Sequence, residues 1–189
     1  MVTLIGLSGS LRQGSFNSSL LRAAADLLPE GAELRIGTIR GIPLYDADVE
    51  ASEGIPTAVA VLKNDIASAD GLLLATPEYN NSIPGVMKNA VDWLSRPPSD
   101  IRRVFGSKPV ALVGASPGGF GTVMSQNAWL PVFRTLGAQV WSEGRLLVPR
   151  AQGVFAADGT LTDPKVREAL RTLLESYVKF VDSTRRARP

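Results

Sequence analysis

The chain contains no cysteine and no histidine among its 189 residues. Their absence excludes a disulfide framework, a zinc site of the usual kind and a cysteine nucleophile. It also excludes a Ser-His-Asp triad, because the general base of that triad is a histidine. Several whole classes of enzyme are therefore ruled out before any motif is considered.

Long apolar runs are absent as well. No stretch approaches the roughly 18 consecutive apolar residues that span a membrane, and no lipidation motif is present. With 44% hydrophobic and 20% charged residues, the composition is that of an ordinary globular chain. We therefore expect one domain, residues 1–189, which is long enough for a sizeable core. We expect it in the cytoplasm and without a membrane partner.

A strong charge of either sign is also lacking, since the formal net charge is +2. The basic excess gathers at Arg102 and Arg103 and at the end of the chain, at Arg185, Arg186 and Arg188. No aromatic residues interleave this tail for base stacking, so it is typical of a solvated terminus. We expect no nucleic-acid partner.

What is present is an alternation of short apolar runs with helical patterns. The expected strands are residues 3–7, 33–36, 71–75, 109–114 and about 139–148. The expected helices are residues 17–28, 56–69, 84–95, 124–136 and 164–184. Three of the strand runs, LIGL, GLLLA and VALVG, are apolar without alternation, as in parallel strands that are buried on both faces.

Five such units predict an α/β fold, namely a doubly wound five-stranded parallel sheet in the flavodoxin-like order 2-1-3-4-5 with helices on both faces. In this order the first and third strands flank the point where the winding reverses, and ligands bind beyond their carboxyl ends. The loops after these two strands, Gly9–Asn17 and Thr76–Gly85, are rich in polar residues. We expect the functional site there.

The first loop, GSLRQGSFN, has the composition of an anion-binding site. A helix that begins near Asn17 presents unpaired N–H groups and a partial positive charge at its start. Ser10, Ser15 and Ser18 add hydroxyl donors, and Arg12 supplies a guanidinium fork suited to phosphate. Several converging donors favour a phosphate monoester over a carboxylate. The alternative is a capped turn that binds no ligand.

The spacing of the loop narrows the kind of phosphate ligand. No lysine follows Gly14, so the loop does not match the P-loop of nucleoside triphosphatases. The segment GLSGS has two residues between its glycines, which weakens the interpretation as a Rossmann dinucleotide motif. A phosphate ligand of another kind is therefore favoured.

A different motif, GASPG at Gly114–Gly118, formally matches the G-x-S-x-G nucleophile elbow of hydrolases. The chain has no histidine to act as the base. In addition, Pro117 directly after Ser116 lacks the N–H group that an oxyanion hole would use. We interpret ASPGGFG as a third loop that faces the ligand.

The loop after the third strand combines prolines with polar side chains. Its candidate site residues are Pro77, Glu78, Tyr79 and Asn80. Backbone groups that the sheet leaves unpaired can contact the edge of a flat polar heterocycle, and Tyr79 can stack on or flank that ring, with core packing as its alternative. In the helix that follows, we expect Trp93 in the core and Lys88 and Asp92 as a surface pair.

Together these segments resemble the signature segments of a known family. GSLRQGSFN (Gly9–Asn17) and PEYNNSIPGVMKNAVDW (Pro77–Trp93) resemble those of the NADPH-dependent FMN reductases, and IPLYDADVE (Ile42–Glu50) is similar to the bacterial quinone and chromate reductase branch. The resemblance runs through nearly the whole chain. It implies a flavodoxin-like fold, non-covalently bound FMN, NADPH or NADH as the reductant, and a homodimer or homotetramer with the flavin near a subunit interface.

Carried over residue by residue, the resemblance implies a set of FMN contacts. Around the phosphate it implies Ser10, Arg12, Ser15, Asn17 and Ser18. Along the isoalloxazine ring it implies Pro77, Glu78, Tyr79 and Asn80, and as a further wall Ser116 and Gly118. One segment, Gly121–Leu130, departs from the branch, because Met124 stands where an arginine is expected. A tetramer contact or anionic-substrate site that depends on this arginine is not carried over.

The resemblance implies an enzyme in which FMN carries the chemistry, with no obligatory catalytic side chain and no metal. NADPH would reduce the flavin and leave, and a small acceptor would then be reduced over the same ring face. Candidate acceptors are quinones, free flavin, azo compounds and chromate. A flavodoxin-type electron carrier is the main alternative, although such carriers are usually strongly acidic and this chain has a net charge of +2. A flavin-free binding module or a hydrolase is the other.

Overall fold

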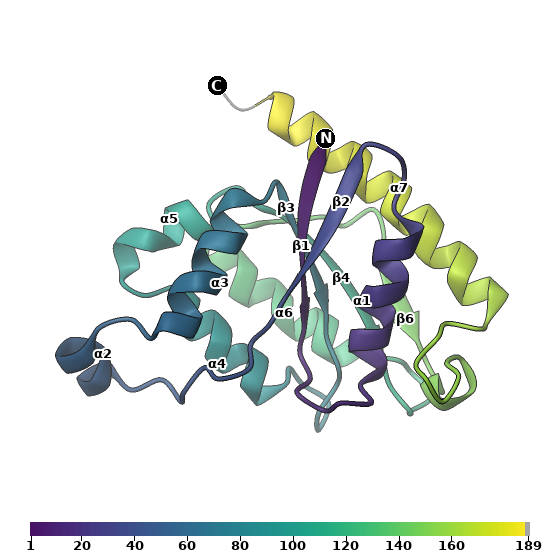
Figure 1. The fold of residues 1–189 in the computed structure, drawn as a ribbon, viewed down its shortest axis with the longest axis horizontal. Coiled ribbons are helices and arrows are strands. Elements are labelled where there is room, and N and C mark those ends of the chain that lie inside the picture. Colours follow the sequence, from purple (N-terminus) through teal and green to yellow (C-terminus); the bar gives the residue numbers. More distant parts are fainter. Residues whose placement is uncertain (188–189) are drawn as a thin grey trace.

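The chain forms a parallel sheet between two layers of helices (Figure 1). The structure, a computed structural model, describes residues 1–187. Its strands are β1 (Val2–Ser8), β2 (Ala32–Gly37), β3 (Gly71–Ala75), β4 (Pro109–Ala115), β5 (Gln139–Val140) and β6 (Leu146–Val148). They lie in the order β2-β1-β3-β4-β5, with β6 also paired to β4. The predicted strand order and parallel pairing are confirmed.

The last position in the sheet is shared by two short strands where one was expected. β5 pairs with the beginning of β4 at Pro109 and Val110. β6 pairs with the end of β4, at Val113–Ala115. The intervening residues 141–145 include Ser142 and Gly144, which favour a turn over a continuous strand.

The helices follow the predicted pattern, with two additions. They are α1 (Phe16–Leu27), α2 (Ala47–Glu53), α3 (Thr57–Ser68), α4 (Gly85–Leu94), α5 (Ile101–Val104), α6 (Val123–Thr135) and α7 (Pro164–Arg186), together with the short 3₁₀ turns η1 (Pro98–Asp100) and η2 (Ala151–Gly153). The sequence did not predict α2 or α5. α5 is a single turn, and α2 buries no side chain, so neither produces the apolar stripe by which a helix is recognised.

Alternate side chains of the central strands enter two separate cores. Leu4 of β1 and Leu73 of β3 point toward α1 and α7, whereas Ile5 and Leu72 point toward α3, α4, α5 and α6. This explains why the strand sequences are apolar without alternation. The two-sided packing fixes the register of β1, β3 and β4 and therefore the positions of the loops at their carboxyl ends.

Two smaller expectations for α4 are confirmed. Trp93 is fully buried, and Lys88 Nζ lies 2.7 Å from Asp92 Oδ1 on the helix surface. Among the described helices, none combines the length and the apolarity needed to cross a membrane. Of the basic tail, Arg185 and Arg186 form ion pairs with Asp182, and Arg188 lies outside the described residues.

Candidate functional site

The first loop leads directly from the end of β1 into the start of α1. Ser15 caps the helix, because its Oγ accepts a hydrogen bond from the Ser18 N–H at 3.3 Å. The N–H groups of Phe16 and Asn17, in the first turn, have no partner within the helix and are available to an anion. The positive end of the helix dipole lies at the same place.

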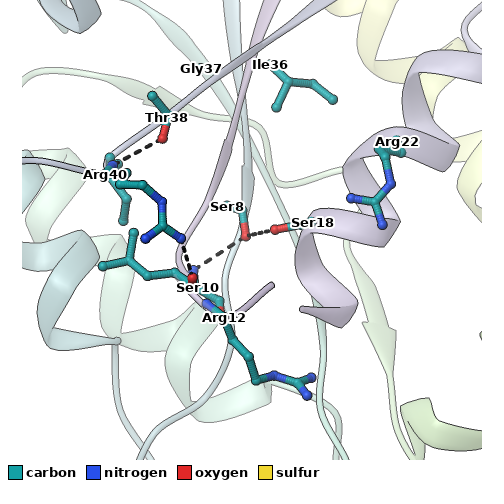
Figure 2. Close-up of a pocket in the computed structure, with 11 residues that line it drawn as sticks. Ser8, Ser10, Arg12, Ser18, Arg22, Ile36, Gly37, Thr38 and Arg40 are labelled. Carbon is teal, nitrogen blue, oxygen red and sulfur yellow. Dashed lines mark hydrogen bonds between the residues drawn. The ribbon is translucent and has the colours of Figure 1, made fainter. Parts of the chain in front are cut away.

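Hydroxyl groups from both ends of the loop converge beside this helix start. Ser18 Oγ donates to Ser8 Oγ at 3.0 Å, and the Arg12 N–H donates to Ser10 Oγ at 3.3 Å. Ser8, Ser10, Arg12 and Ser18 all line a cavity of about 360 Å³ (Figure 2). The sequence analysis named three of these residues and missed Ser8, which lies just after the expected strand, residues 3–7, and forms the end of β1 in the structure.

Asn17 has a different local role from the one expected of it. Its Nδ2 donates to the Ala115 carbonyl and its Oδ1 accepts from the Ala115 N–H, each at 2.9 Å. The side chain thus ties the start of α1 to the end of β4. Because its amide groups are used in this way, Asn17 can offer an anion its main-chain N–H.

The loop after β3 contains a tight two-residue turn. Tyr79 and Ser82 exchange main-chain hydrogen bonds, and the residues between them, Asn80 and Asn81, have φ angles of 51° and 60°. Two left-handed residues in succession are typical of a type I′ turn, which asparagine tolerates well. The turn is exposed, and the N–H groups at its tip can face a ligand.

The loops after β1 and β3 are held together. The Gly9 N–H donates to the Ala75 carbonyl at 2.9 Å, and a Cβ at position 9 would lie only 2.7 Å from Pro77 Cδ. Glycine is therefore required there for close approach. Pro77 is buried at this contact. The Tyr79 hydroxyl reaches Ser10 Oγ at 3.4 Å, so a ligand that contacts one loop is next to the other.

Glu78 is oriented toward the protein and not toward open space. Its Oε2 accepts hydrogen bonds from the N–H groups of Met124 and Ser125, at 2.8 and 3.1 Å. The carboxylate therefore caps the start of α6, where the helix dipole favours a negative charge. Through this cap the loop after β3 is fixed to α6, the helix that follows β4.

The loop after β4 forms the third side. Ser116 is buried, and its hydroxyl donates to the Gly121 carbonyl at 2.5 Å. Ser116 therefore closes its own loop and does not form the nucleophile elbow considered above. Gly118 is exposed, and its carbonyl accepts from the Arg150 N–H at 3.0 Å.

The three loops offer the kinds of groups that FMN requires. The first supplies hydroxyl, guanidinium and main-chain donors for a phosphate, and the Arg12 guanidinium is exposed, 5.2 Å from the centroid of the Phe16 ring. The loop after β3 offers the exposed side chain of Tyr79 and the N–H groups of its turn. The loop after β4 offers exposed glycines along one wall. The three loops lie beyond β1, β3 and β4, adjacent strands of the sheet, which is where open α/β sheets bind ligands.

The cavity also contains residues that sequence reasoning did not assign to the site. Arg22 of α1 and Thr38 and Arg40 after β2 line it together with the first loop. No motif marks them, because they belong to other segments. Arg22 is on the helix that follows the first loop, and the pairing of β2 beside β1 brings Thr38 and Arg40 to the same place.

Known proteins share this combination of sequence and fold. The NADPH-dependent FMN reductase family matches residues 2–153. The chain is 42% identical over 180 residues, 95% of each chain, to an NAD(P)H-dependent FMN reductase of Pseudomonas aeruginosa. It is 37% identical, over 94% of each chain, to a 2-hydroxy-1,4-benzoquinone reductase of a Burkholderia species. The structure of FerB, a flavoenzyme NAD(P)H:(acceptor) oxidoreductase of Paracoccus denitrificans, is similar with a TM-score of 0.86 at 31% identity, over 97% of this chain and 99% of that one.

Proposed function

Because this chain belongs to the NADPH-dependent FMN reductase family, it is an FMN-dependent oxidoreductase that takes electrons from NAD(P)H, and we propose that it passes them to quinones. The observation that carries the proposal is the joining of the loops after β1 and β3 through Gly9, Pro77 and the hydrogen bond from Tyr79 to Ser10. A phosphate donor set and a ring-binding turn thereby form one continuous site. Quinones are proposed because a similar chain is named a benzoquinone reductase.

In this proposal the first loop holds the FMN phosphate. Ser10, Arg12 and Ser18 contribute side chains, and Asn17 contributes its main-chain N–H. Ser15 fixes the helix start that presents this N–H. The donors are in place without the ligand, because the loop is already organised by its own hydrogen bonds. Such preorganisation lowers the entropic cost of binding.

The loops after β3 and β4 hold the ring. We propose that Tyr79 flanks it, that the N–H groups near Asn80 contact its polar edge, and that Gly118 leaves room on the opposite wall. Pro77, Glu78 and Ser116 act by fixing these loops, through the contacts described above. When bound, FMN supplies the hydride chemistry that no side chain of this protein provides. Donors aimed at the ring edge stabilise negative charge that develops there.

The electron-carrier alternative has less support. A carrier without its own NAD(P)H oxidation would share the fold, but the similar chains are named as reductases and an NAD(P)H oxidoreductase. The weakly basic net charge of +2 also differs from the acidity of such carriers. Azo compounds, chromate and free flavin stay as further candidate acceptors.

We further propose that two copies associate through the groove between α4 and α6. The groove has a volume of about 480 Å³ and is lined by apolar side chains including Val91, Ile101 and Val132. Exposed Val86, at the start of α4, and exposed Met124, at the start of α6, add apolar surface. Exposed apolar surface of this kind typically marks an interface. The cytoplasmic location and the single domain over residues 1–189 stay predictions.

A direct test measures NAD(P)H oxidation by the purified, FMN-loaded protein with 1,4-benzoquinone as the acceptor. The proposal predicts turnover that needs both FMN and the quinone and yields the hydroquinone. Rapid reduction of the bound flavin without acceptance of electrons by the quinone would reject the quinone assignment. It would leave the flavin-dependent oxidation of NAD(P)H intact.

A further inference from the structure

The cavity beside the first loop extends away from the proposed flavin site. Its walls are α1, the loop after β1 and Ile36–Arg40, which comprises the end of β2 and the residues that follow it. The crevice shares the loop after β1 with the proposed flavin site, but its other walls lie on the β2 side of β1, opposite β3 and β4. Neither Ser15 nor Asn17, at the helix start, lines it. We call it the β2 crevice.

The residues that line the β2 crevice give it a positive charge, although Arg22 also lines a second cavity that contains Asp26 and Asp158. Arg12, Arg22 and Arg40 line it, and no described residue that lines it is acidic. None of these three arginines forms an ion pair with a described carboxylate. By contrast, Arg35 and Arg96 pair with Glu33 and Glu50. Such an arrangement favours a ligand with more than one negative charge.

Two of the guanidinium groups are positioned by neutral acceptors. Arg40 Nη2 donates to the Leu11 carbonyl at 2.6 Å, and Arg22 Nη2 donates to Ser19 Oγ at 2.8 Å. Each guanidinium has five N–H donors, so most of its donors remain for a ligand. Figure 2 shows Arg22 on the α1 side and Arg40 on the other side, with Ser8 and Ser18 between them. Two guanidinium forks on either side of hydroxyl donors suit a phosphate monoester.

The FMN phosphate accounts for one wall of this crevice and leaves Arg22 and Arg40 without a ligand. The flavin belongs at the switch point between β1 and β3, where Ser10, Arg12, Ser18 and the helix start supply the donors for its phosphate. NADPH carries a phosphate monoester of its own, the 2′-phosphate, whereas NADH has a hydroxyl group at that position. In dinucleotide-binding α/β folds, an arginine near the end of the second strand accommodates this 2′-phosphate. Arg40 lies three residues after the end of β2, which is an analogy of position alone, because the first loop lacks the Rossmann motif.

The two sites lie at the same edge of the sheet. The end of β2 lies two strand positions from the end of β3, about 10 Å across the sheet. Tyr79, beside the proposed ring site, already touches Ser10 at the rim of the crevice. A nicotinamide over the flavin can therefore extend its other end across the first loop.

We propose that the β2 crevice binds the 2′-phosphate of NADPH and that Arg22 and Arg40 make the enzyme prefer NADPH over NADH. The inference rests on the proposed function, because it concerns the reductant of that reaction. It assigns a ligand to Arg22 and Arg40, which the proposed FMN site does not use, whereas Ser10, Arg12 and Ser18 border both sites.

The test combines binding with kinetics for Arg22→Gln, Arg40→Gln and the double variant. Calorimetry on the FMN-loaded protein compares 2′,5′-ADP with 5′-AMP, which lacks the 2′-phosphate. Steady-state assays compare NADPH with NADH, and free FMN with riboflavin as acceptors. Arg102→Gln, which removes an exposed arginine outside the crevice, is the matched control.

The wild type is expected to bind 2′,5′-ADP at least about tenfold more tightly than 5′-AMP, consistent with charged hydrogen bonds to phosphate. In the double variant this preference disappears and the KM for NADPH rises by about tenfold or more. The KM for NADH and the FMN content of the double variant stay unchanged. The Arg102→Gln protein keeps the nucleotide preference and the KM values of the wild type.

Several results would overturn the inference. One is equal binding of the two nucleotides by the wild type. Another is loss of FMN from the variants, which would assign Arg22 and Arg40 to the flavin phosphate. A third is a loss of activity with free FMN but not riboflavin, with 2′,5′-ADP binding intact, which would assign the crevice to the acceptor. Failure of the proposed function is separate, because nucleotide binding is measured without turnover.

Discussion

At the scale of single residues, the site depends on side chains that serve the ligand and side chains that hold the loops. Arg12 is exposed, and no described carboxylate pairs with it, so its charge is available to a phosphate. Asn17, by contrast, is buried and fully engaged with the backbone of Ala115. The two residues stand five positions apart in one motif, yet their replacement should have different consequences.

For Arg12→Ala we expect weaker FMN binding with little change in folding. A hydrogen bond between charged groups contributes about 1.5–3 kcal/mol, so the Kd for FMN should rise by about tenfold or more. The measurement is a fluorescence titration of the FMN-free protein with FMN. Arg134→Ala, an exposed arginine on α6, is the control and should bind FMN as the wild type does. An unchanged Kd would remove Arg12 from the phosphate site.

For Asn17→Ala we expect a loss of stability even without FMN. The substitution leaves the N–H and C=O groups of Ala115 unsatisfied in a buried place, which costs about 2–4 kcal/mol. Urea unfolding of the FMN-free protein measures this loss, and Asn127→Ala, at an exposed position on α6, should change it little. If both variants unfold at the same urea concentration, the tie between α1 and β4 is not structural.

At the scale of elements, the least predictable part of the chain is the segment that contains α2. This helix buries no residue and extends from the body beside α4 (Figure 1). It is fixed by polar contacts: the Asn89 and Trp93 side chains donate to the Pro43 carbonyl, and Arg96 Nε donates to Glu50 at 2.8 Å. Contacts between residues so distant in sequence leave no periodic signal, so the sequence could not reveal this element.

The Glu50 contact makes a pH-dependent contribution to stability. The hydrogen bond from Arg96 lowers the pKa of Glu50 below its ordinary value. A carboxyl group whose folded pKa is depressed stabilises the protein above its unfolded pKa, about 4.3, and loses this effect as the pH falls through the folded pKa. Glu50→Gln should therefore be less stable than the wild type at pH 7. The difference should shrink below about pH 4.

Urea unfolding of both proteins between pH 3 and pH 7 measures this convergence. Glu53→Gln, an exposed residue at the end of α2, should show a small difference that does not depend on pH. A Glu50→Gln deficit that is constant over the whole range would mean that the ion pair with Arg96 does not account for it.

The elements that were predicted well share one physical basis. β1, β3 and β4 are buried on both faces, and α7 has an apolar stripe from Leu170 to Val181. These patterns are local and can be read from the sequence. They also made it possible to predict the strand order and the loops of the site. The family resemblance of Gly9–Asn17 and Pro77–Trp93 is confirmed by the match over residues 2–153. The orientation of Glu78 and the approach of Arg40 depend on tertiary contacts and could not be read in this way.

At the scale of the whole molecule, the fold places charge and apolar surface on different sides of the flavin loops. The β2 crevice carries three arginines, whereas the groove between α4 and α6 combines apolar side chains with the Lys88–Asp92 pair. The site lies between them, at the carboxyl ends of the central strands. Under the two proposals, the nucleotide and a second copy of the chain contact different surfaces of the protein.

The proposed association through the groove predicts a change of mass. Val132→Asp introduces a charge among apolar side chains that a partner would cover, and burying an unpaired charge is costly. Light scattering after gel filtration should give a dimer or tetramer for the wild type and a monomer for this variant. Val61→Asp, an exposed apolar position on α3 away from the groove, should leave the mass unchanged. A monomeric wild type would contradict the proposal.

The central claim is that the three loops hold a flavin that NAD(P)H can reduce. The most direct measurement is the visible absorption spectrum of the protein after incubation with FMN and desalting, before and after NADPH is added without oxygen. The account predicts a retained flavin band that bleaches on addition of NADPH. A retained band that does not bleach would contradict the reductase activity, and no retained band would contradict the FMN site itself.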